Sequence, residues 1–376
     1  MAVDLATRSL LHDKLRFLIT VSGVAFAVTL VFVQVGLFLG LLDNASVTID
    51  HIDADLWVTS RNTPNVDFAH TFPDTAVKRV RSVPGVAHAD NLIVWFVTVN
   101  LPSGAQEGSL LYALEDFSRW NIPWRVEQGE LSDLRRGQYL FLDDSATKRY
   151  GPFAVGEYRE VMGQRMKIIG RSKDALSFST TPISFVDFDR AQTLNPQSLQ
   201  GKTTYVLVKL EPGADAAAVK AEIARRLPYN DVYTKKDWAA RSRSYWVRST
   251  GLGLNMYLTV FLGCLVGIVV VAQTLYTSTM EHIKEFGTVK AIGGGNLDIY
   301  RILGKQASIA AVAGFVLGAF MAYALRPAIH RIDLKLIIPP AFVAIVFVGS
   351  LAMCLAAAII SFRKVAAIDP ALVFRG

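Results

Sequence analysis

The residues that could do chemistry in this chain are few and poorly arranged for catalysis. Gly201-Lys202-Thr203 resembles the end of a phosphate-binding loop, but Pro196 occupies the position of the required earlier glycine. Asp143 and Asp144 are adjacent carboxylates. Neighbouring side chains on a strand point to opposite faces, so we expect this pair to form a solvated turn. We therefore predict no catalytic residue in this chain.

Metal binding is not indicated by the histidines either. None of the six lies in a His-Glu-x-x-His motif or at the paired spacing of a zinc site; they are His12, His51, His70, His88, His282 and His330. We expect the chain to bind no metal and no cofactor of its own. A catalytic triad assembled across the fold is not readable from one sequence, but no Gly-x-Ser-x-Gly motif is present. An integral-membrane enzyme is therefore the least favoured class.

Composition and charge indicate a membrane protein. Of the 376 residues, 52% are hydrophobic and 19% are charged, and the mean hydropathy is +0.33. This balance excludes a disordered chain. The net charge is +7, but residues 43–250 contain 26 Lys and Arg against 25 Asp and Glu. The basic excess therefore flanks the apolar runs, which argues against a nucleic-acid partner and for contact with membrane lipid.

Four uncharged stretches are long enough to cross a membrane as helices. A hydrocarbon core of ~30 Å needs about 20 helical residues. The stretches contain 26, 30, 20 and 27 residues, at 17–42, 251–280, 306–325 and 336–362. The first is too long for the apolar region of a signal peptide, and no Ala-x-Ala follows it, so we expect an uncleaved anchor.

Basic residues predict the orientation of these spans. They are concentrated in the entry helix 1–16, the segment 281–305 and the tail 363–376, which we therefore place in the cytoplasm. The short outer loop 326–335 also carries basic residues, so the bias is incomplete. The expected fold is an α-helical membrane protein with four transmembrane helices and an α+β extracytoplasmic domain inserted between helices 1 and 2. We expect it in the bacterial inner (cytoplasmic) membrane.

The outer domain, residues 43–250, is expected to contain two strand–helix–strand units. Apolar alternation and helical spacing place the first at 55–99 and the second at 204–234. Short strands separated by turns suggest an inserted β subdomain at about 100–200, with no signal that fixes strand order. Both cysteines, Cys264 and Cys354, lie in spans, so no disulfide is expected in this domain.

A stalk is expected where the outer domain joins the second span. We predict a continuous helix from Lys236 to Asn255, with aromatic residues that include Trp238 near the membrane boundary. Gly251 and Gly253 lie at this junction and are expected to act as a hinge, because glycine weakens helix continuity.

Pairs of glycines four residues apart mark close helix contacts in the spans. They are Gly36 with Gly40, Gly263 with Gly267, and Gly314 with Gly318. Small residues at this spacing let two helix backbones approach closely. We expect the first two pairs to contribute to helix packing or to a dimer contact.

The segment 281–305 carries an apolar ridge, since Phe286, Val289 and Ile292 recur at helical spacing in a polar stretch. An exposed ridge of this kind indicates a partner. Residues Glu285-Phe-Gly-Thr-Val-Lys-Ala-Ile-Gly293 are similar to the E-I-x-x-L-R-A-[LI]-G pattern of the FtsX/MacB-type (type VII) ABC transporter permeases. The tail motif at 366–372 and the entry helix at 8–16 also resemble that family. Asp53-Ala-Asp-Leu-Trp-Val58 looks most like its DevC-type subgroup.

The resemblance implies a homodimeric permease without ATPase activity, which passes the motion of a separate ABC ATPase to the outer domain. ATP and Mg would be bound by that ATPase. The implied coupling residues are Glu285, Phe286, Val289, Lys290, Ile292 and Gly293. It also implies export with a membrane-fusion adaptor and an outer-membrane channel. An FtsX-like signalling permease that regulates an extracytoplasmic enzyme without transporting substrate is the alternative, and the substrate is not readable from the sequence.

Overall fold

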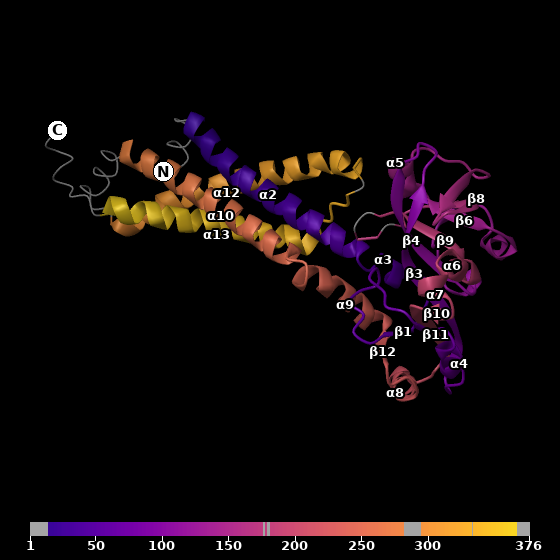
Figure 1. Cartoon of the computed structure of the whole chain (residues 1–376). Helices are drawn as coiled ribbons and strands as arrows, with labels where there is room; N and C mark the ends of the chain where they lie inside the picture. Colours follow the sequence, from indigo (N-terminus) through magenta and orange to yellow (C-terminus); the bar gives the residue numbers. More distant parts are fainter. Residues whose placement is uncertain (1–13, 176, 179–180, 282–294, 333, 367–376) are drawn as a thin grey trace. The chain divides into compact units, whose positions relative to one another are not determined.

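The chain folds into two compact units, seen in the computed structural model of Figure 1. The structure describes residues 14–175, 177–178, 181–281, 295–332 and 334–366. Leu41–Leu252 form the outer unit, and the segments on either side, Met1–Gly40 and Gly253–Gly376, form the membrane unit.

The membrane unit contains four long apolar helices. They are α2 (Lys14–Asn44), α10 (Leu252–Glu281), α12 (Asn296–His330) and α13 (Pro340–Ala366). Each includes a stretch long and apolar enough to span a bilayer, at Phe17–Asn44, Leu252–Glu281, Ile299–His330 and Pro340–Ile359. The prediction of four spans with an α+β domain after the first is confirmed.

The bounds of the last two spans differ from those expected. Helix α12 begins ten residues before the predicted 306 and continues to His330 through Pro327, so the first half of the expected loop 326–335 is helical. Helix α13 begins at Pro340 rather than 336. Proline is favoured at the first helical position, because its missing N–H is not needed there.

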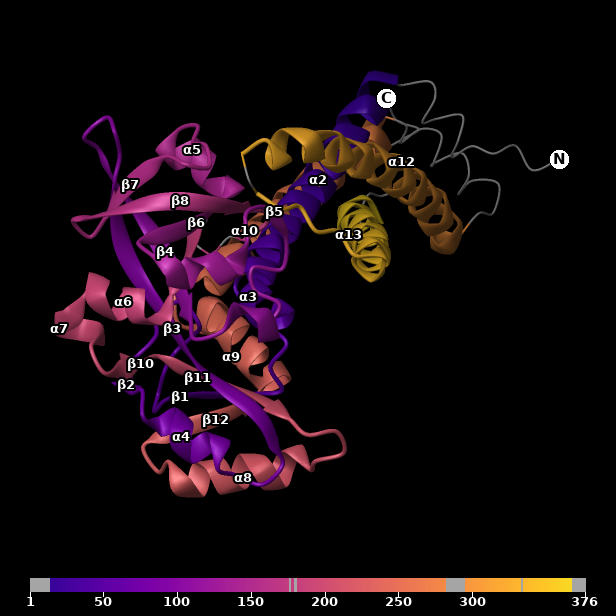
Figure 2. The same cartoon turned by 90° about the vertical axis from the view of Figure 1, so that its right-hand side faces the viewer.

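The outer unit is built on one ten-stranded sheet (Figure 2). The spatial order is β12-β1-β11-β3-β4-β9-β6-β8-β5, and β7 pairs with β3 and β8; β10 and β2 form a separate small sheet. The strands are β1 (Leu56–Ser60), β2 (Phe72–Pro73), β3 (Val86–Asn100), β4 (Gln106–Leu114), β5 (Val126–Gln128), β6 (Tyr139–Asp143), β7 (Tyr158–Val161), β8 (Gln164–Ser172), β9 (Ile183–Asp187), β10 (Lys202–Thr203), β11 (Tyr205–Leu210) and β12 (Asn230–Thr234).

Short helices complete the outer unit. They are α3 (Val47–His51), α4 (Ala76–Arg81), α5 (Thr147–Tyr150), α6 (Phe188–Leu194), α7 (Pro196–Leu199), α8 (Ala216–Arg226) and α9 (Lys235–Arg248), with 3-10 turns at Phe117–Arg119, Leu131–Arg136 and Asp144–Ala146.

The two expected strand–helix–strand units interleave in the sheet. Strand β11 lies between β1 and β3, and β1 lies between β12 and β11, all in antiparallel pairs. This is the split βαβ arrangement of ferredoxin-like folds. Helices α4 and α8 share a buried cluster that includes Val80 and Ile223 and therefore cover one face of the sheet.

The inserted segment extends the same sheet. Strand β3 is 15 residues long, and β4 pairs along its second half from Leu92 to Asn100. Strand β9 then joins β4 in parallel, and β6, β8 and β5 follow. One long strand therefore belongs to both the interleaved half and the inserted half.

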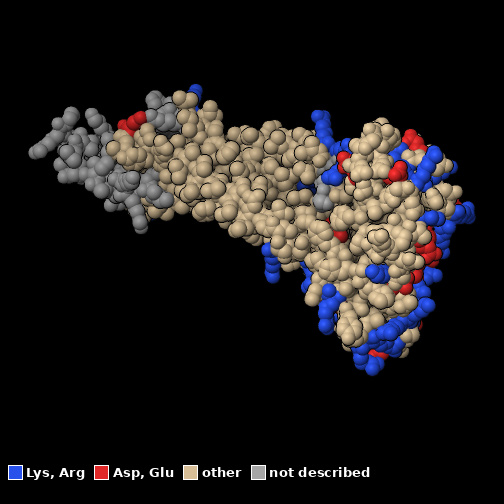
Figure 3. All heavy atoms as spheres, viewed as in Figure 1, with Lys and Arg blue, Asp and Glu red and all other residues tan. Residues whose placement is uncertain are grey.

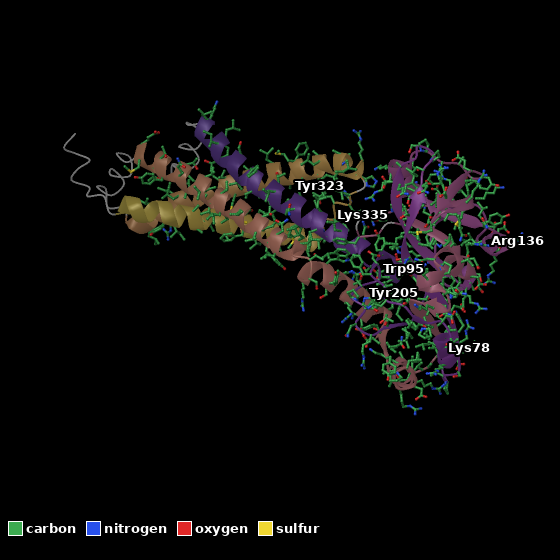
Figure 4. The ribbon with its side chains drawn as sticks, viewed as in Figure 1. Lys78, Trp95, Arg136, Tyr205, Tyr323 and Lys335 are labelled. Atoms are coloured by element: carbon green, nitrogen blue, oxygen red, sulfur yellow. The ribbon has the colours of Figure 1, made fainter. Side chains whose placement is uncertain are left out.

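The opposite face of the sheet carries a core rich in aromatic rings. Trp57, Tyr205 and Trp238 are each fully buried, and Trp238 of α9 stacks on Tyr233 with ring centroids 5.2 Å apart. In Figure 4 the labelled Tyr205 lies within the outer unit, whereas Lys78 and Arg136 lie at its surface. The expectation that Trp238 lies at the membrane boundary is wrong, because it is a core residue.

Asp143 is also buried, contrary to the expected solvated turn. Its carboxylate accepts hydrogen bonds from Ser145 N (3.0 Å), Ser172 Oγ (2.9 Å) and Ala175 N (3.1 Å). Asp144 instead pairs with Arg171, whose Nη2 lies 2.6 Å from Oδ1. The two carboxylates therefore join separate structural networks.

Candidate functional site

The glycines of α2 lie against the segment that precedes α13. A Cβ on Gly36 would lie 2.7 Å from Leu336 Cδ1, and Ile337 N donates a 3.1 Å hydrogen bond to Gly36 O. A Cβ on Gly40 would overlap the carbonyl of Lys335. Only a residue without a side chain allows this approach. Gly36 and Gly40 are therefore engaged within the chain.

The glycines of α10 face α2. A Cβ on Gly263 would lie 2.7 Å from Leu30 Cδ2, and one on Gly267 would lie 3.0 Å from both Ala27 Cβ and Met353 Sδ. These contacts place the glycine edge of α10 against α2, with α13 nearby. The pair therefore serves helix packing inside one copy of the chain.

A third glycine pair joins α12 to α2. A Cβ on Gly314 would lie 2.5 Å from Val24 Cβ, and one on Gly318 would lie 2.7 Å from Ala25 O. Thr29 Oγ1 also donates to Gly318 O at 3.1 Å. Helix α2 therefore packs closely against α10, α12 and the segment before α13, and we regard it as the central helix of the membrane unit.

The outward faces of these helices are apolar. Exposed large hydrophobic residues occur on each, and on α10 they are Leu254, Tyr257, Leu258, Phe261, Leu262, Leu265, Val266, Val269 and Tyr276. In Figure 3 the described spans present an almost uncharged surface, whereas charged residues gather over the outer unit. Such a surface suits lipid or another apolar helix.

The junction between α9 and α10 is broken. Helix α9 ends at Arg248 and α10 begins at Leu252, with Gly251 at φ +73° between them. Thr250 Oγ1 closes the end of α9 by donating to Trp246 O at 2.6 Å. The expected continuous helix from Lys236 to Asn255 is therefore wrong. Gly251 lies at the break, Gly253 lies inside the first turn of α10, and the hinge remains a prediction.

Helix α9 is fixed to α3, which directly follows the first span. Ser242 Oγ donates to Ala45 O at 2.6 Å. Arg243 Nη2 pairs with Asp50 Oδ2 at 2.7 Å. These bonds connect the two points at which the chain passes between the units.

Asp67 is a buried titratable group that no sequence pattern indicated. Burial raises the pKa of its carboxyl from 3.8 to about 7, although the backbone N–H of Phe178 donates to it and lowers this pKa. Tyr112 and Tyr205 lie close enough for the charge of Asp67 to raise their pKa values further. The Asp67 segment is ordered by Asn65 Oδ1, which accepts hydrogen bonds from Asp67 N and Phe68 N.

A polar cleft of about 570 Å³ lies elsewhere on the outer unit. Charged side chains from α4, α6 and the neighbouring segments make up more than half of its lining, and Asn91 of β3 also contributes. Arg81 there bridges Asp90 and Glu115 at 2.8 and 2.6 Å. Among the described residues, no group of three His, Cys, Asp or Glu side chains could hold a metal ion. The cleft therefore offers charge pairing.

The expected coupling residues lie outside the described part of the chain. These are Glu285, Phe286, Val289, Lys290, Ile292 and Gly293. Most of the expected entry helix and of the tail motif also lies outside it. Their roles remain predictions.

Two family models match separate parts of the chain. Residues 17–226 match the MacB-like periplasmic core domain, and residues 257–370 match the FtsX-like permease C-terminal region. An ABC transporter permease of Mycobacterium tuberculosis is 25% identical over 376 residues, which cover 99% of each chain. One of Methanocaldococcus jannaschii is 21% identical over 286 residues, covering 70% of this chain and 68% of its own.

Solved structures also resemble the outer unit, at low similarity. The periplasmic region of MacB from Actinobacillus actinomycetemcomitans is 12% identical, with a TM-score of 0.39, and the match covers 50% of this chain and 92% of that one. The extracellular domain of the transporter YknZ from Gram-positive bacteria is 17% identical, with a TM-score of 0.38, covering 48% and 99%. None of these matches distinguishes the DevC-type subgroup, which stays a prediction.

Proposed function

Because the chain belongs to the ABC transporter permeases that combine a MacB-like periplasmic core domain with an FtsX-like C-terminal region, we propose that it transmits ATP-driven motion to its outer domain. The ATP is hydrolysed on a separate ATPase, which also holds the Mg. This chain binds neither and is a permease subunit rather than an enzyme.

One observation carries this proposal: the spans lack ionisable groups in their interiors. No Asp, Glu, Lys, Arg or His occurs at 17–42, 253–280, 306–325 or 340–362. A polar substrate path through a membrane protein normally contains such groups, because they replace water along the route. Movement of the helices is therefore better supported than conduction between them.

The packing of the membrane unit supports a mechanical role. Helix α2 contacts α10 and α12 at glycines that leave no room for a side chain, so a shift of one helix is passed to the next. In the outer unit, Ser242 and Arg243 of α9 are bonded to Ala45 and Asp50. Motion that arrives through α10 would thus act on both segments that connect the outer unit to the membrane, the end of α2 and the start of α10.

The assembly follows from the same proposal. Two copies form a homodimer in the bacterial inner membrane, with the N- and C-termini and the coupling residues in the cytoplasm. A membrane-fusion adaptor and an outer-membrane channel complete the exporter. An adaptor that copurifies would favour export, whereas a cell-wall hydrolase that copurifies would favour the signalling alternative.

The decisive experiment tests docking of the ATPase. Phe286→Ala removes the proposed aromatic anchor, and such anchors commonly contribute about 2 kcal/mol at an interface. Assembly should weaken about thirtyfold, since each 1.4 kcal/mol is tenfold. Glu285→Lys should also weaken it by reversing a charge. Tyr229→Ala is the control, because Tyr229 is an exposed aromatic residue of the outer unit.

The readout is ATPase activity and the amount of ATPase that copurifies with each variant. If Phe286→Ala and Glu285→Lys lower the amount of copurified ATPase and its activity, and Tyr229→Ala does not, the proposal is supported. Normal recovery with both cytoplasmic variants would refute the docking site. Sustained ATP hydrolysis by the purified chain alone would refute the proposal that a separate ATPase hydrolyses the ATP.

A further inference from the structure

Five aromatic rings gather at the end of α9 in the outer unit. The ring centroid of Phe68 lies 5.9 Å from Phe96, 6.0 Å from Tyr245 and 5.8 Å from Trp246. Phe178 stacks on Trp246 at 3.8 Å with an interplanar angle of 12°. We call Phe68, Phe96, Tyr245 and Trp246, with Phe178 behind them, the aromatic patch.

The aromatic patch is open on its outer side. Phe68 is 41% exposed and Phe96 is 42% exposed, which is unusual for two large apolar rings in contact. Phe68 is held in place, because Asn65 Oδ1 accepts a 2.8 Å hydrogen bond from its backbone N. A fixed apolar surface of this kind indicates an apolar partner.

Chain connectivity limits how far the aromatic patch lies from the membrane. Trp246 precedes Leu252, the first residue of α10, by only six residues, which span at most about 21 Å when extended. One turn earlier, Ser242 is bonded to Ala45, which directly follows α2. The aromatic patch is therefore tethered close to both points at which the chain enters the membrane.

The same stretch of α9 carries positive charge. The helix contains five Lys and Arg residues and one Asp. Arg241, Tyr245 and Arg248 follow one another at spacings of four and three, so they share a face of the helix, and both arginines are exposed. Amphipathic rings beside Arg and Lys are typical of segments that lie in the lipid headgroup region.

We propose that the aromatic patch docks on the phospholipid headgroup layer of the membrane that α2 and α10 cross. Its rings lie among the glycerol and upper acyl groups, and Arg241 and Arg248 bind lipid phosphates. The outer domain then has a second, non-covalent attachment to the membrane besides its two chain connections. This inference is independent of the proposed ATPase coupling, since it concerns only the outer unit and lipid.

A site-specific fluorescence experiment on the full chain tests the proposal. Ala69→Cys places a bimane label beside Phe68 while keeping every ring of the aromatic patch. Ala218→Cys, on the exposed side of α8, is the matched control. Cys264 and Cys354 are replaced by alanine in both. The protein is reconstituted in vesicles of phosphatidylcholine and phosphatidylglycerol, with and without a bromine-labelled phosphatidylcholine that quenches bimane.

We expect the label at 69 to lose emission with the brominated lipid and the label at 218 to keep it. Replacing Phe68 and Phe96 by serine should abolish the quenching at 69. Arg241→Gln with Arg248→Gln should reduce lipid contact about fivefold per charge in vesicles with phosphatidylglycerol. Normal elution in gel filtration would show that these variants are folded.

Three results would overturn the proposal. The first is a label at 69 that is not quenched by lipid but is quenched by iodide in solution, since the aromatic patch would then be bare. The second is protection from both quenchers, which would show that protein covers it, either a second copy or another part of this chain. The third is quenching that persists in folded variants lacking both Phe68 and Phe96.

Discussion

Asp67→Asn should remove a pH dependence from the stability of the outer unit. Asp67 is buried, and burial raises the pKa of its carboxyl from 3.8 to about 7. The native state therefore favours the protonated form, whereas the unfolded chain ionises near the ordinary value. The contribution of the protonated Asp67 carboxyl to the free energy of unfolding is therefore fully present below about pH 4 and is lost as the pH rises to about 7.

The size of the effect follows from that shift. Raising the pKa from 3.8 to about 7 covers about three pH units, and each unit corresponds to 1.36 kcal/mol. The free energy of unfolding should thus fall by up to about 4 kcal/mol between these limits. Asparagine is neutral at every pH, and its side-chain oxygen can still accept the hydrogen bond from Phe178 N. Asp67→Asn should therefore be more stable than the original chain at about pH 8.

Thermal unfolding followed by tryptophan fluorescence provides the assay, with the full chain in detergent at about pH 5 and about pH 8. Asp143→Asn is the contrasting variant, because Asp143 accepts three hydrogen bonds and one amide oxygen cannot replace both carboxylate oxygens. It should destabilise the outer unit at both pH values. If Asp67→Asn keeps the pH slope of the original chain, or is less stable at about pH 8, the assigned protonation of Asp67 is wrong.

Three further experiments test the helix packing, the aromatic core of the outer unit and the proposal that a separate ATPase hydrolyses ATP. Gly314→Ile should lower the thermal midpoint of the membrane unit, since overpacking against Val24 costs about 1–3 kcal/mol, whereas Gly349→Ala should not, because no atom lies within 4 Å of its added Cβ. Trp238→Ala should destabilise the outer unit by about 3–5 kcal/mol in denaturant unfolding. The purified chain alone should release no phosphate from ATP, and hydrolysis should appear only when its ATPase is added, which a phosphate-release assay measures.

The spans were predictable because hydropathy and length are properties of the local sequence. The start of α12 was not predictable in this way, because its first turns contain Asp298, Arg301 and Lys305, and a search for uncharged stretches excludes them. Charged residues at a helix end can lie beyond the hydrocarbon and remain helical. The helix therefore extends past the segment that the membrane requires.

Strand order in the outer unit could not be read from local patterns. Strand β4 was not among the expected strands, because Gln106-Glu-Gly-Ser109 begins it with polar residues and glycine. Its second half, Leu110–Leu114, is fully buried and apolar, which is a usable signal. The insertion of β11 between β1 and β3 depends on pairing residues more than 100 positions apart, which periodicity does not report.

The break before α10 did have a local signal. Gly251 lies three residues after the end of α9 and directly before the start of α10, and it adopts φ +73°, a left-handed conformation that glycine takes without strain and that interrupts a helix. The apolar and aromatic residues on either side of it favour one continuous helix. At this position, the tendency of glycine to interrupt a helix outweighs the tendency of the flanking apolar residues to continue it.

The glycine pairs indicated close approach but not the partner, and this limits how the proposed homodimer can form. Gly36, Gly40, Gly263 and Gly267 are all packed against residues of the same chain, so their surfaces are not available to a second copy. The outward face of α10 carries large side chains such as Phe261 and Leu265, whereas α13 exposes Gly349, whose added Cβ would have no atom within 4 Å. Two copies that meet through α10 would therefore interdigitate bulky residues, and their helices would lie farther apart than α2 and α10 do within one copy; close backbone contact between copies would need an open small-residue position such as Gly349 of α13.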